Sequence, residues 1–261
     1  MQLRNKACLV TGAGSGIGRS TALLMAREGA RVAAMSRTVE EVQETVDEIR
    51  AAGGEAISTC ADVSGEDDMI RGVAEVVAAF GTIDVVFANA GVNGVWAALE
   101  DLSAAEWDHT IAINLRGTFL TLKYTIPHLK KQGGAVVINS SVNGTRVFSN
   151  SGATAYGATK AAQIAITKMA ALELAEHGIR VNAVCPGAIE TEIGDNTEKR
   201  GTEQLGVPVD FPRGWHPLRG APGTADQVAR AVVFLASDAA DHITGTEMWI
   251  DGGESLVGIK G

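Results

Sequence analysis

Short apolar runs alternate with longer stretches of helical periodicity from the first residues of this 261-residue chain almost to its end. An apolar run of about four to eight residues is typical of a buried strand, and apolar residues at about every third or fourth position are typical of a helix. The runs predict strands at Ala7–Thr11, Arg31–Met35, Ala56–Cys60, Ile83–Ala88, Ala135–Ser140, Arg180–Cys185 and Glu247–Asp251. The periodic stretches predict helices near Gly16–Glu28, Val39–Ala51, Glu66–Ala79, Ala104–Lys131, Thr154–His177 and Ala225–Ser237.

A glycine stands just after most of these helices and a few residues before the next strand. Glycine can end a helix in the left-handed conformation without the steric penalty of a Cβ atom. The glycines in this position are Gly29, Gly53, Gly81, Gly133 and Gly178. This repeated order of strand, helix and glycine predicts an α/β fold. We expect a doubly wound (Rossmann) parallel sheet of about seven strands with helices on both faces and right-handed crossovers.

The length favours a single domain over residues 1–261, because one α/β domain of this size buries a sizeable core. Residues 192–223 depart from the strand–helix rhythm. They contain four prolines, Pro208, Pro212, Pro217 and Pro222, and no sustained periodicity. The segment is too long for a plain connection, so we interpret it as a substrate-loop insertion within the domain.

Composition narrows the function classes. The formal net charge of -9 disfavours non-specific binding to nucleic acid. Cys8, Cys60 and Cys185 each stand in an apolar run, which predicts buried thiols in a reducing compartment. The sequence contains neither a C-x-x-C pair nor a cluster of histidines, so we expect no metal. It shows no signal-peptide pattern and no apolar stretch of about 20 residues, so we expect a cytoplasmic protein without a membrane partner.

A glycine-rich turn follows the first predicted strand and opens the first predicted helix. Its sequence, Thr11 to Gly18, is TGAGSGIG. Glycines let a backbone approach a dinucleotide pyrophosphate closely, and the helix N-terminus offers unpaired N–H groups to the anion. The spacing alone is weak evidence, since a plain strand-to-helix turn would also use glycine. Its place in the first strand–helix unit favours a cofactor site that includes Gly12, Ser15, Gly16, Ile17 and Gly18.

The choice of dinucleotide is read at the end of the second strand. An acidic residue there would bond the ribose 2'-hydroxyl, but the run ends in Ser36-Arg37 and lacks a carboxylate. A serine hydroxyl and a guanidinium suit a 2'-phosphate, so we expect NADP(H), with NAD(H) as the alternative. The competing interpretation is that Arg37 is a solvated surface charge.

Tyr156 and Lys160 lie four positions apart in a predicted helix, so both project from the same face. An ordinary tyrosine, with a pKa of about 10, is a poor base at neutral pH. A neighbouring ammonium and the start of a helix both favour the phenolate, so the sequence predicts a lowered pKa for Tyr156. The pair is a candidate general acid/base.

Two further polar groups stand beside this pair in the predicted fold. Ser140 and Ser141 close a strand, where a hydroxyl could hold a substrate oxygen or could simply cap the strand end. Asn114 interrupts an apolar helical face, and such an amide needs hydrogen-bond partners; it could organise a water or a bend.

These motifs together resemble the short-chain dehydrogenases/reductases, in the branch of single-domain members of roughly 250 residues. The resemblance covers nearly the whole chain. It rests on the glycine turn Thr11–Gly18, Asp62-Val63, Asn89-Ala90-Gly91, the set Asn114, Ser141, Tyr156 and Lys160, and the segment Pro186-Gly187-Ala188-Ile189-Glu190-Thr191. Ser141 lies 15 residues before Tyr156, a wider spacing than is usual in the family. The run Ser141–Gly144 nevertheless fits the motif better than Ser140 does.

The resemblance implies an NAD(P)-dependent oxidoreductase that moves hydride between nicotinamide and a ketone or secondary alcohol. It implies that Tyr156 is the general acid/base, that Ser141 polarises the carbonyl, that Lys160 lowers the Tyr156 pKa and holds the nicotinamide ribose, and that Asn114 anchors a relay water. It further implies adenine contacts at Asp62 and Val63, and cofactor contacts at Asn89, Ala90, Gly91, Pro186, Gly187, Ile189 and Thr191. A homotetramer is implied in the same way.

The substrate site is expected beside the catalytic segment. Asn93, Trp96, Asn143 and Phe148 are its candidate residues together with Ser141 and Tyr156, and Trp215 and Leu218 of the insertion could add apolar walls. Ordinary loop packing explains these positions equally well. The alternatives to an oxidoreductase are a catalytically silent dinucleotide sensor, which the complete catalytic set disfavours, and an isomerase or epimerase, which the short length disfavours.

Overall fold

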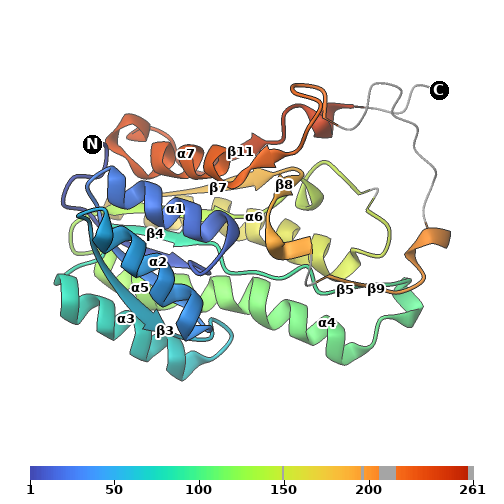
Figure 1. The fold of residues 1–261 in the computed structure, drawn as a ribbon, viewed down its shortest axis with the longest axis horizontal. Helices are drawn as coiled ribbons and strands as arrows, with labels where there is room; N and C mark the ends of the chain where they lie inside the picture. The colour runs from blue at the N-terminus through green and yellow to red at the C-terminus, as the bar shows by residue number, and fades with distance from the viewer. Residues whose placement is uncertain (149, 195–196, 206–215, 258–261) are drawn as a thin grey trace.

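The computed structural model describes residues 1–148, 150–194, 197–205 and 216–257. Its centre is a seven-stranded parallel sheet in the order β11-β7-β6-β4-β1-β2-β3 (Figure 1). The strands are β1 (Ala7–Thr11), β2 (Arg31–Ser36), β3 (Glu55–Cys60), β4 (Val85–Ala88), β6 (Gly134–Asn139), β7 (Ile179–Pro186) and β11 (Glu247–Ile250). The order reverses direction on the two sides of β1, which confirms the doubly wound fold.

Alternate side chains of β1 enter two separate cores. Ala7 and Leu9 pack into a cluster on one face of the sheet, while Cys8 and Val10 pack into a cluster on the other. Every residue of this strand is buried. The continuous apolar runs seen in the sequence are therefore strands covered on both faces, as a parallel sheet requires.

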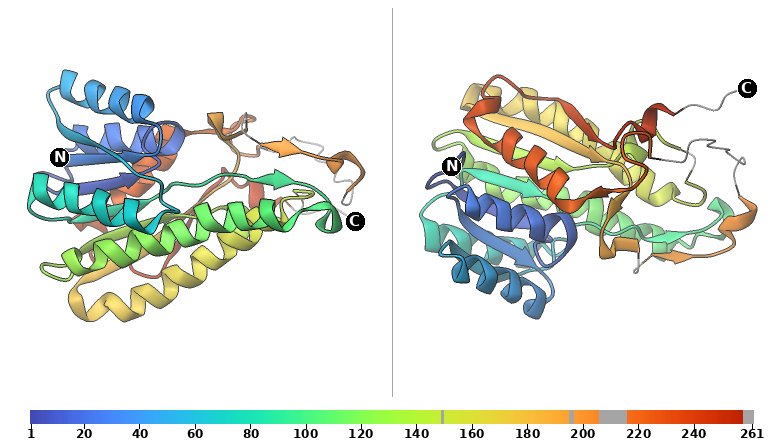
Figure 2. Two further views of the ribbon diagram at one scale, coloured as in Figure 1. Left: turned by 90° about the horizontal axis from the view of Figure 1, so that it is seen from below. Right: turned by 45° about the horizontal axis from the view of Figure 1, so that its top comes forward.

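Within the described residues, three helices cover one face of the sheet and four lie on its other side, one of which packs on a neighbouring helix rather than on the strands (Figures 1 and 2). The first group is α1 (Gly16–Arg27), α2 (Val39–Ala51) and α7 (Ala225–Ala236). The second group is α3 (Glu66–Phe80), α4 (Ala104–Ile111), α5 (Gly117–Leu129) and α6 (Thr154–Leu174). The left-handed conformation predicted at Gly29, Gly53, Gly81, Gly133 and Gly178 is confirmed by positive φ at all five.

The single helix predicted over 104–131 is interrupted. A π-helical segment, η2 (Ala112–Arg116), separates α4 from α5, and α5 ends at Leu129. The wider turn surrounds Asn114, whose side chain bonds Val92, 22 residues away. The sequence suggested a bend at Asn114, and this bend is a π-turn. Such turns are often found at functional sites.

Short elements surround the carboxyl ends of the strands. They are β5 (Val95–Trp96), β8 (Ile189–Glu190), β9 (Glu198–Lys199), β10 (Gly223–Thr224), η1 (Leu99–Asp101), η3 (Val142–Gly144), η4 (Ala175–His177), η5 (Glu192–Gly194), η6 (Thr202–Gln204), η7 (Asp238–Ala240) and η8 (Glu254–Leu256). In the expected insertion, β9 pairs with β5, and Arg200 donates to both carboxylate oxygens of Glu106 at 2.9 and 3.0 Å. These contacts fix part of the insertion against α4.

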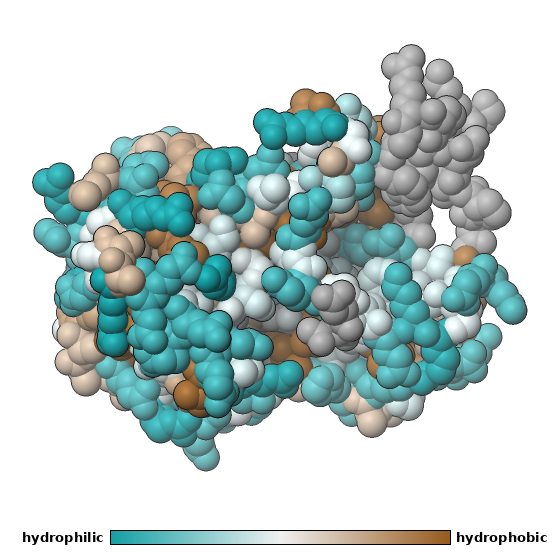
Figure 3. Space-filling view, viewed as in Figure 1, coloured by the Kyte–Doolittle hydropathy of each residue, from teal (hydrophilic) through white to brown (hydrophobic). Residues whose placement is uncertain are grey.

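The face of the molecule seen in Figure 3 is mainly hydrophilic, with small apolar patches. Within the described residues, no helix combines the length and the apolar character needed to cross a bilayer. Cys8 and Cys185 are buried as predicted, but Cys60 is exposed. The prediction for Cys60 is wrong because β3 is the edge strand of the sheet and Cys60 is its last residue.

Candidate active site

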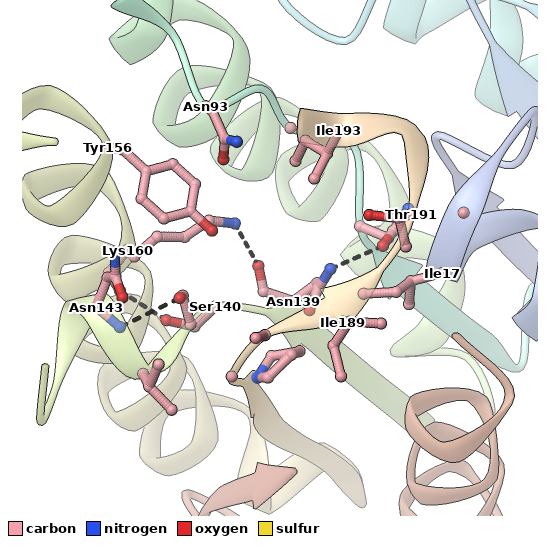
Figure 4. A pocket seen from close by; sticks show the side chains of 18 of the residues that line it. Ile17, Asn93, Asn139, Ser140, Asn143, Tyr156, Lys160, Ile189, Thr191 and Ile193 are labelled. Carbon is pink, nitrogen blue, oxygen red and sulfur yellow. Dashed lines mark hydrogen bonds between the residues drawn. The ribbon is translucent and has the colours of Figure 1, made fainter. Parts of the chain in front are cut away.

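A cavity of about 850 Å³ opens at the carboxyl ends of the central strands, where a doubly wound sheet binds its ligands. This volume falls in the range of small-molecule and cofactor sites. Figure 4 shows side chains that line it. Of the residues predicted from the sequence, the lining contains Gly12, Ser15, Gly16, Ile17, Gly18, Asn89, Ala90, Gly91, Asn93, Trp96, Ser141, Asn143, Tyr156, Lys160, Pro186, Gly187, Ile189 and Thr191.

The glycine turn between β1 and α1 forms one wall. Gly12 and Gly16 have φ angles of 65° and 50°, in the left-handed region that favours glycine. A Cβ atom at Gly18 would lie 1.9 Å from the carbonyl oxygen of Gly12, so the turn closes only around glycine. α1 has no acidic residue in its first turn, and within the described residues Ser15 makes no side-chain cap. The first N–H groups of α1 are therefore suited to an anion.

Polar side chains fasten the ends of β1, β4 and β6 at the floor of the cavity. Thr11 Oγ1 accepts the N–H groups of Asn89 at 3.0 Å and of Ala90 at 3.1 Å. Asn89 Nδ2 donates to the Thr11 carbonyl at 2.9 Å, and Asn139 Nδ2 donates to Asn89 Oδ1 at 2.8 Å. Asn139 was not among the predicted site residues. Its signal in the sequence is an amide that ends an apolar strand directly before Ser140.

Tyr156 and Lys160 lie one turn apart near the start of α6 and both line the cavity (Figure 4). Tyr156 and Ser141 both line the cavity, and an interaction with the Ser141 side chain lowers the Tyr156 pKa. Ser141 is held in place because its Oγ accepts the N–H of Asn143 at 3.1 Å, at the start of η3. Two hydroxyls from different elements therefore face the same cavity, where they can hold the oxygen of a carbonyl or an alcohol.

Burial dominates the ionisation of this pair. It raises the pKa of the Tyr156 phenol, against the smaller lowering effect of the interaction with Ser141. It lowers the pKa of Lys160 to about 8. The predicted lowering of the Tyr156 pKa is therefore wrong. The Lys160 ammonium lies 5.4 Å from the centre of the Tyr156 ring and donates to the Asn139 carbonyl at 2.7 Å rather than to the phenol oxygen.

The two serines at the end of β6 have different surroundings. Ser140 Oγ donates to the main-chain carbonyl of Lys160 at 2.8 Å, so its hydrogen ties the strand end to α6. Ser141 instead faces Tyr156. The geometry favours Ser141 as the hydroxyl that meets a ligand, in agreement with the motif.

Asn114 lies behind the cavity rather than in its wall and is fully buried. Its Oδ1 accepts the N–H of Val92 at 2.8 Å, and its Nδ2 donates to the Val92 carbonyl at 2.8 Å and to Thr159 Oγ1 at 3.2 Å. A Cβ atom at Gly91 would lie 3.2 Å from Asn114 Oδ1 and 3.7 Å from Lys160 Nζ. The absence of a side chain at Gly91 thus lets the backbone pass close to both groups.

Several predicted residues lie outside the cavity lining, namely Ser36, Arg37, Asp62, Val63 and Phe148. Ser36 and Arg37 end and follow β2, beyond the glycine turn, and Arg37 is exposed. Asp62 Oδ1 accepts from the N–H and the hydroxyl of Ser64, and Val63 is buried among core residues.

Two of the predicted apolar walls, Phe148 and Leu218, do not line the described cavity. Phe148 is 77% exposed and Leu218 is 74% exposed, because both side chains leave their loops toward solvent. Trp215 lies outside the described residues. Trp96 does line the cavity, and Lys199 Nζ lies 5.0 Å from the centre of its ring. Lining residues that the sequence did not indicate are Val92, Asn139, Asn150 and Glu254, while Glu192, Ile193, His216 and Gly220 belong to the predicted substrate-loop insertion.

Known proteins resemble this chain in sequence and in fold. The family profile described as Enoyl-(Acyl carrier protein) reductase matches residues 12–255. The cyclohexanol dehydrogenase of Acinetobacter sp. strain SE19 is 37% identical over 252 residues, which cover 96% of this chain and 95% of that protein. The crystal structure of a 3-ketoacyl-ACP reductase from Sinorhizobium meliloti 1021 matches with a TM-score of 0.93 and 57% identity, over 95% of this chain and 98% of that one. A 3-ketoacyl-(acyl-carrier-protein) reductase from Brucella melitensis complexed with NADH matches with a TM-score of 0.86 and 31% identity, over 97% and 99% of the two chains.

The fold and the site define a dinucleotide-binding oxidoreductase. The chain belongs to the short-chain dehydrogenase/reductase family. Its reaction class is the NAD(P)-dependent transfer of hydride between nicotinamide and a ketone or secondary alcohol.

Proposed function

We propose that this protein is an NADP(H)-preferring reductase of an uncharged ketone, with Tyr156 as the proton donor. The observation that carries the proposal is the grouping of Tyr156, Ser141 and Lys160 in one cavity that begins at the glycine turn. A buried phenol with a raised pKa stays protonated at neutral pH. Such a group is ready to give a proton to an oxygen that gains negative charge, which favours reduction over oxidation near pH 7.

Each residue of the set has a distinct part in this proposal. Ser141 donates a hydrogen bond to the carbonyl oxygen and so orients and polarises it. Tyr156 gives its proton to the same oxygen as negative charge develops there. Lys160 holds the nicotinamide ribose, and Asn114 anchors a water that can return the proton.

The residues around the glycine turn fit a dinucleotide. The glycine turn forms a cradle because Gly12 and Gly16 adopt left-handed conformations and Gly18 has no side chain. A side chain at these positions would fill the cradle. Asn89, Ala90 and Gly91 would lie along the cofactor, Pro186, Gly187, Ile189 and Thr191 would meet its nicotinamide end, and Asp62 and Val63 would lie toward the adenine. Bound there, the nicotinamide supplies or accepts the hydride.

The preference for NADP(H) is supported by the exposed guanidinium of Arg37 and the hydroxyl of Ser36 at the end of β2. One nearby group opposes it. The Oε2 of Glu41 lies 2.8 Å from the position that a Cβ of Gly14 would take, and Ser36 Oγ lies 3.4 Å from the same point. A carboxylate so close to Ser36 would repel a 2'-phosphate, so the balance between Arg37 and Glu41 decides the preference.

An uncharged substrate fits the described lining. Two carboxylates, Glu192 and Glu254, stand among the described lining residues. These carboxylates disfavour an acidic or phosphorylated compound. Trp96 offers an apolar face, and Asn93 and Asn143 offer amides.

Exposed apolar side chains on α5 and α6 offer a surface for assembly. Phe119 on α5 and Met169 and Leu172 on α6 are large apolar side chains that are 51%, 72% and 80% exposed. Their position supports packing between copies through these helices, in the homotetramer that the family resemblance implies. We place the protein in the cytoplasm.

The decisive experiment is a panel of neutral ketones and secondary alcohols, measured with NADPH and NADH by absorbance of the reduced nicotinamide. We expect turnover with at least one ketone. Tyr156→Phe should lower kcat by about a thousandfold, the scale of general acid catalysis, while leaving cofactor affinity unchanged. Tyr124→Phe is the matched control. Tyr124, the other tyrosine of the chain, lies on α5 and bonds Glu66 of α3, so this variant should retain full activity. Equal activity of both variants would contradict the proposal.

A further inference from the structure

A seam of polar side chains is buried between the α4–η2–α5 run and α6, which lie side by side in Figure 2. The threonine hydroxyls in this seam donate hydrogen bonds to main-chain carbonyls of the same helical run. Thr118 Oγ1 donates to the Asn114 carbonyl at 2.7 Å, Thr121 Oγ1 to the Gly117 carbonyl at 2.8 Å, and Thr167 Oγ1 to the Gln163 carbonyl at 2.8 Å. These bonds stay within one helix and do not connect the two sides of the seam.

Gln163 behaves differently, because its side chain crosses from α6 to η2. Its Nε2 donates to the main-chain carbonyl of Asn114 at 2.8 Å and to Thr118 Oγ1 at 2.9 Å. A carbonyl can only accept, so the amide nitrogen must face it. In the opposite direction, Asn114 Nδ2 donates to Thr159 Oγ1 on α6. Two reciprocal bonds therefore join the π-turn to the helix that carries Tyr156 and Lys160.

These bonds form one connected path to the reacting groups. Gln163 holds the peptide carbonyl of Asn114, and the Asn114 side chain holds both main-chain groups of Val92, directly after Gly91. Thr159 Oγ1 in turn donates to the Tyr156 carbonyl at 2.7 Å. The orientation of the Asn114 amide toward Lys160 thus depends on a side chain that does not line the cavity.

Stability alone does not explain a glutamine at this position. Gln163 is 1% exposed, and among the described residues its Oε1 is buried without a hydrogen-bond partner. A buried acceptor without a partner costs free energy, which offsets part of the stability that the two Nε2 hydrogen bonds contribute.

We propose that Gln163 is a positioning residue, which fixes the π-turn so that the Asn114 side chain keeps its place beside Gly91 and Lys160. This inference rests on the proposed function for its consequence on turnover, but its structural part can be measured without turnover. The N–H of Val92 is the reporter, because it bonds Asn114 Oδ1 at 2.8 Å and is protected from solvent exchange only while Asn114 stays in place.

The test compares Gln163→Leu with the control Thr167→Val, one turn further along the same seam. In hydrogen–deuterium exchange, Gln163→Leu should speed exchange at Val92 by about tenfold, while the rest of α6 and the melting temperature stay at wild-type values. In kinetics, kcat should fall about tenfold with the KM of the ketone and the Kd of NADPH changed less than about twofold, and Thr167→Val should match wild type in every measurement. Gln163→Met serves in the same way if the leucine variant does not fold.

Wild-type exchange at Val92 in a well-folded Gln163→Leu or Gln163→Met would overturn the inference. Faster exchange throughout α6, or an equal loss of kcat in Thr167→Val, would also overturn it, since both outcomes describe a general packing role. If the wild-type protein turns over no compound of the panel, the proposed function fails, and the exchange at Val92 still decides the role of Gln163.

Discussion

Lys160 donates a hydrogen bond from Nζ to the main-chain carbonyl of Asn139 at 2.7 Å, which holds a buried ammonium at the end of a neighbouring strand. One carbonyl partner does not replace the lost water, so burial lowers the pKa of Lys160 to about 8. The burial of the charged Lys160 therefore lowers the free energy of unfolding at neutral pH, as is common for sites built on desolvated groups.

This cost predicts a pH dependence of stability. Between pH 8 and the ordinary lysine value of 10.5, the folded protein binds fewer protons at Lys160 than the unfolded chain does, so its stability should rise with pH. The full shift corresponds to about 3 kcal/mol, and most of it should develop between about pH 8 and 10. Below about pH 8 the penalty is complete.

Urea unfolding of the wild type and Lys160→Met at a series of pH values measures the effect. The difference in unfolding free energy should shift in favour of the wild type as the pH rises. Lys168→Met is the matched control on the same helix, because Lys168 is an exposed lysine paired with Glu247. A pH-independent difference between wild type and Lys160→Met would show that the lysine is not desolvated as described.

Cofactor choice should respond in opposite directions to two substitutions near Ser36. Arg37→Ala should weaken NADPH binding by about tenfold through loss of a charge-assisted bond to the 2'-phosphate, while NADH binding stays nearly constant. Glu41→Gln should strengthen NADPH binding, because it removes the carboxylate whose Oε2 lies near Gly14 and Ser36. Fluorescence titration with both cofactors gives the four dissociation constants. Equal losses for NADPH and NADH in Arg37→Ala would contradict the preference for NADP(H).

The fold could be predicted because its signals are local. Apolar runs of strand length appear as a sheet buried on both faces, and the glycines after the helices have the expected positive φ. The π-turn could not be predicted as such, because its partner for Asn114 is Val92, which reaches it only through the folded topology. The ionisation of Tyr156 was mispredicted for the same reason. Sequence spacing gives its distance from Lys160 but not the burial contributed by other elements.

The sequence does not determine which loop aromatic residues form the cavity wall. Phe148 and Trp96 are both aromatic residues in loops after strands, and the sequence pattern does not distinguish them. Trp96 is turned into the cavity because β5 pairs with β9 and its Nε1 donates to the Asn93 carbonyl at 3.3 Å. Phe148 has no such constraint among the described residues and points to solvent.

The same contrast predicts a difference in substrate binding. Trp96→Ala should raise the KM of a neutral ketone about tenfold, because it removes an apolar face of the cavity, and kcat should change less. Phe148→Ala should leave both constants unchanged. Steady-state kinetics at saturating cofactor measures the pair. A larger effect at Phe148 would mean that this side chain closes over the bound substrate.

The two serines at the end of β6 should separate stability from turnover. Ser140→Ala removes a buried bond to the Lys160 carbonyl and should lower the unfolding free energy by about 1 kcal/mol with little change in kcat. Ser141→Ala removes the hydroxyl that meets Tyr156 and should lower kcat by about a hundredfold, because the substrate oxygen loses a preorganised donor. Urea unfolding and single-turnover kinetics on both variants distinguish the two roles. A large kinetic loss confined to Ser140→Ala would reverse the assignment and place the substrate oxygen on the other side of the strand end.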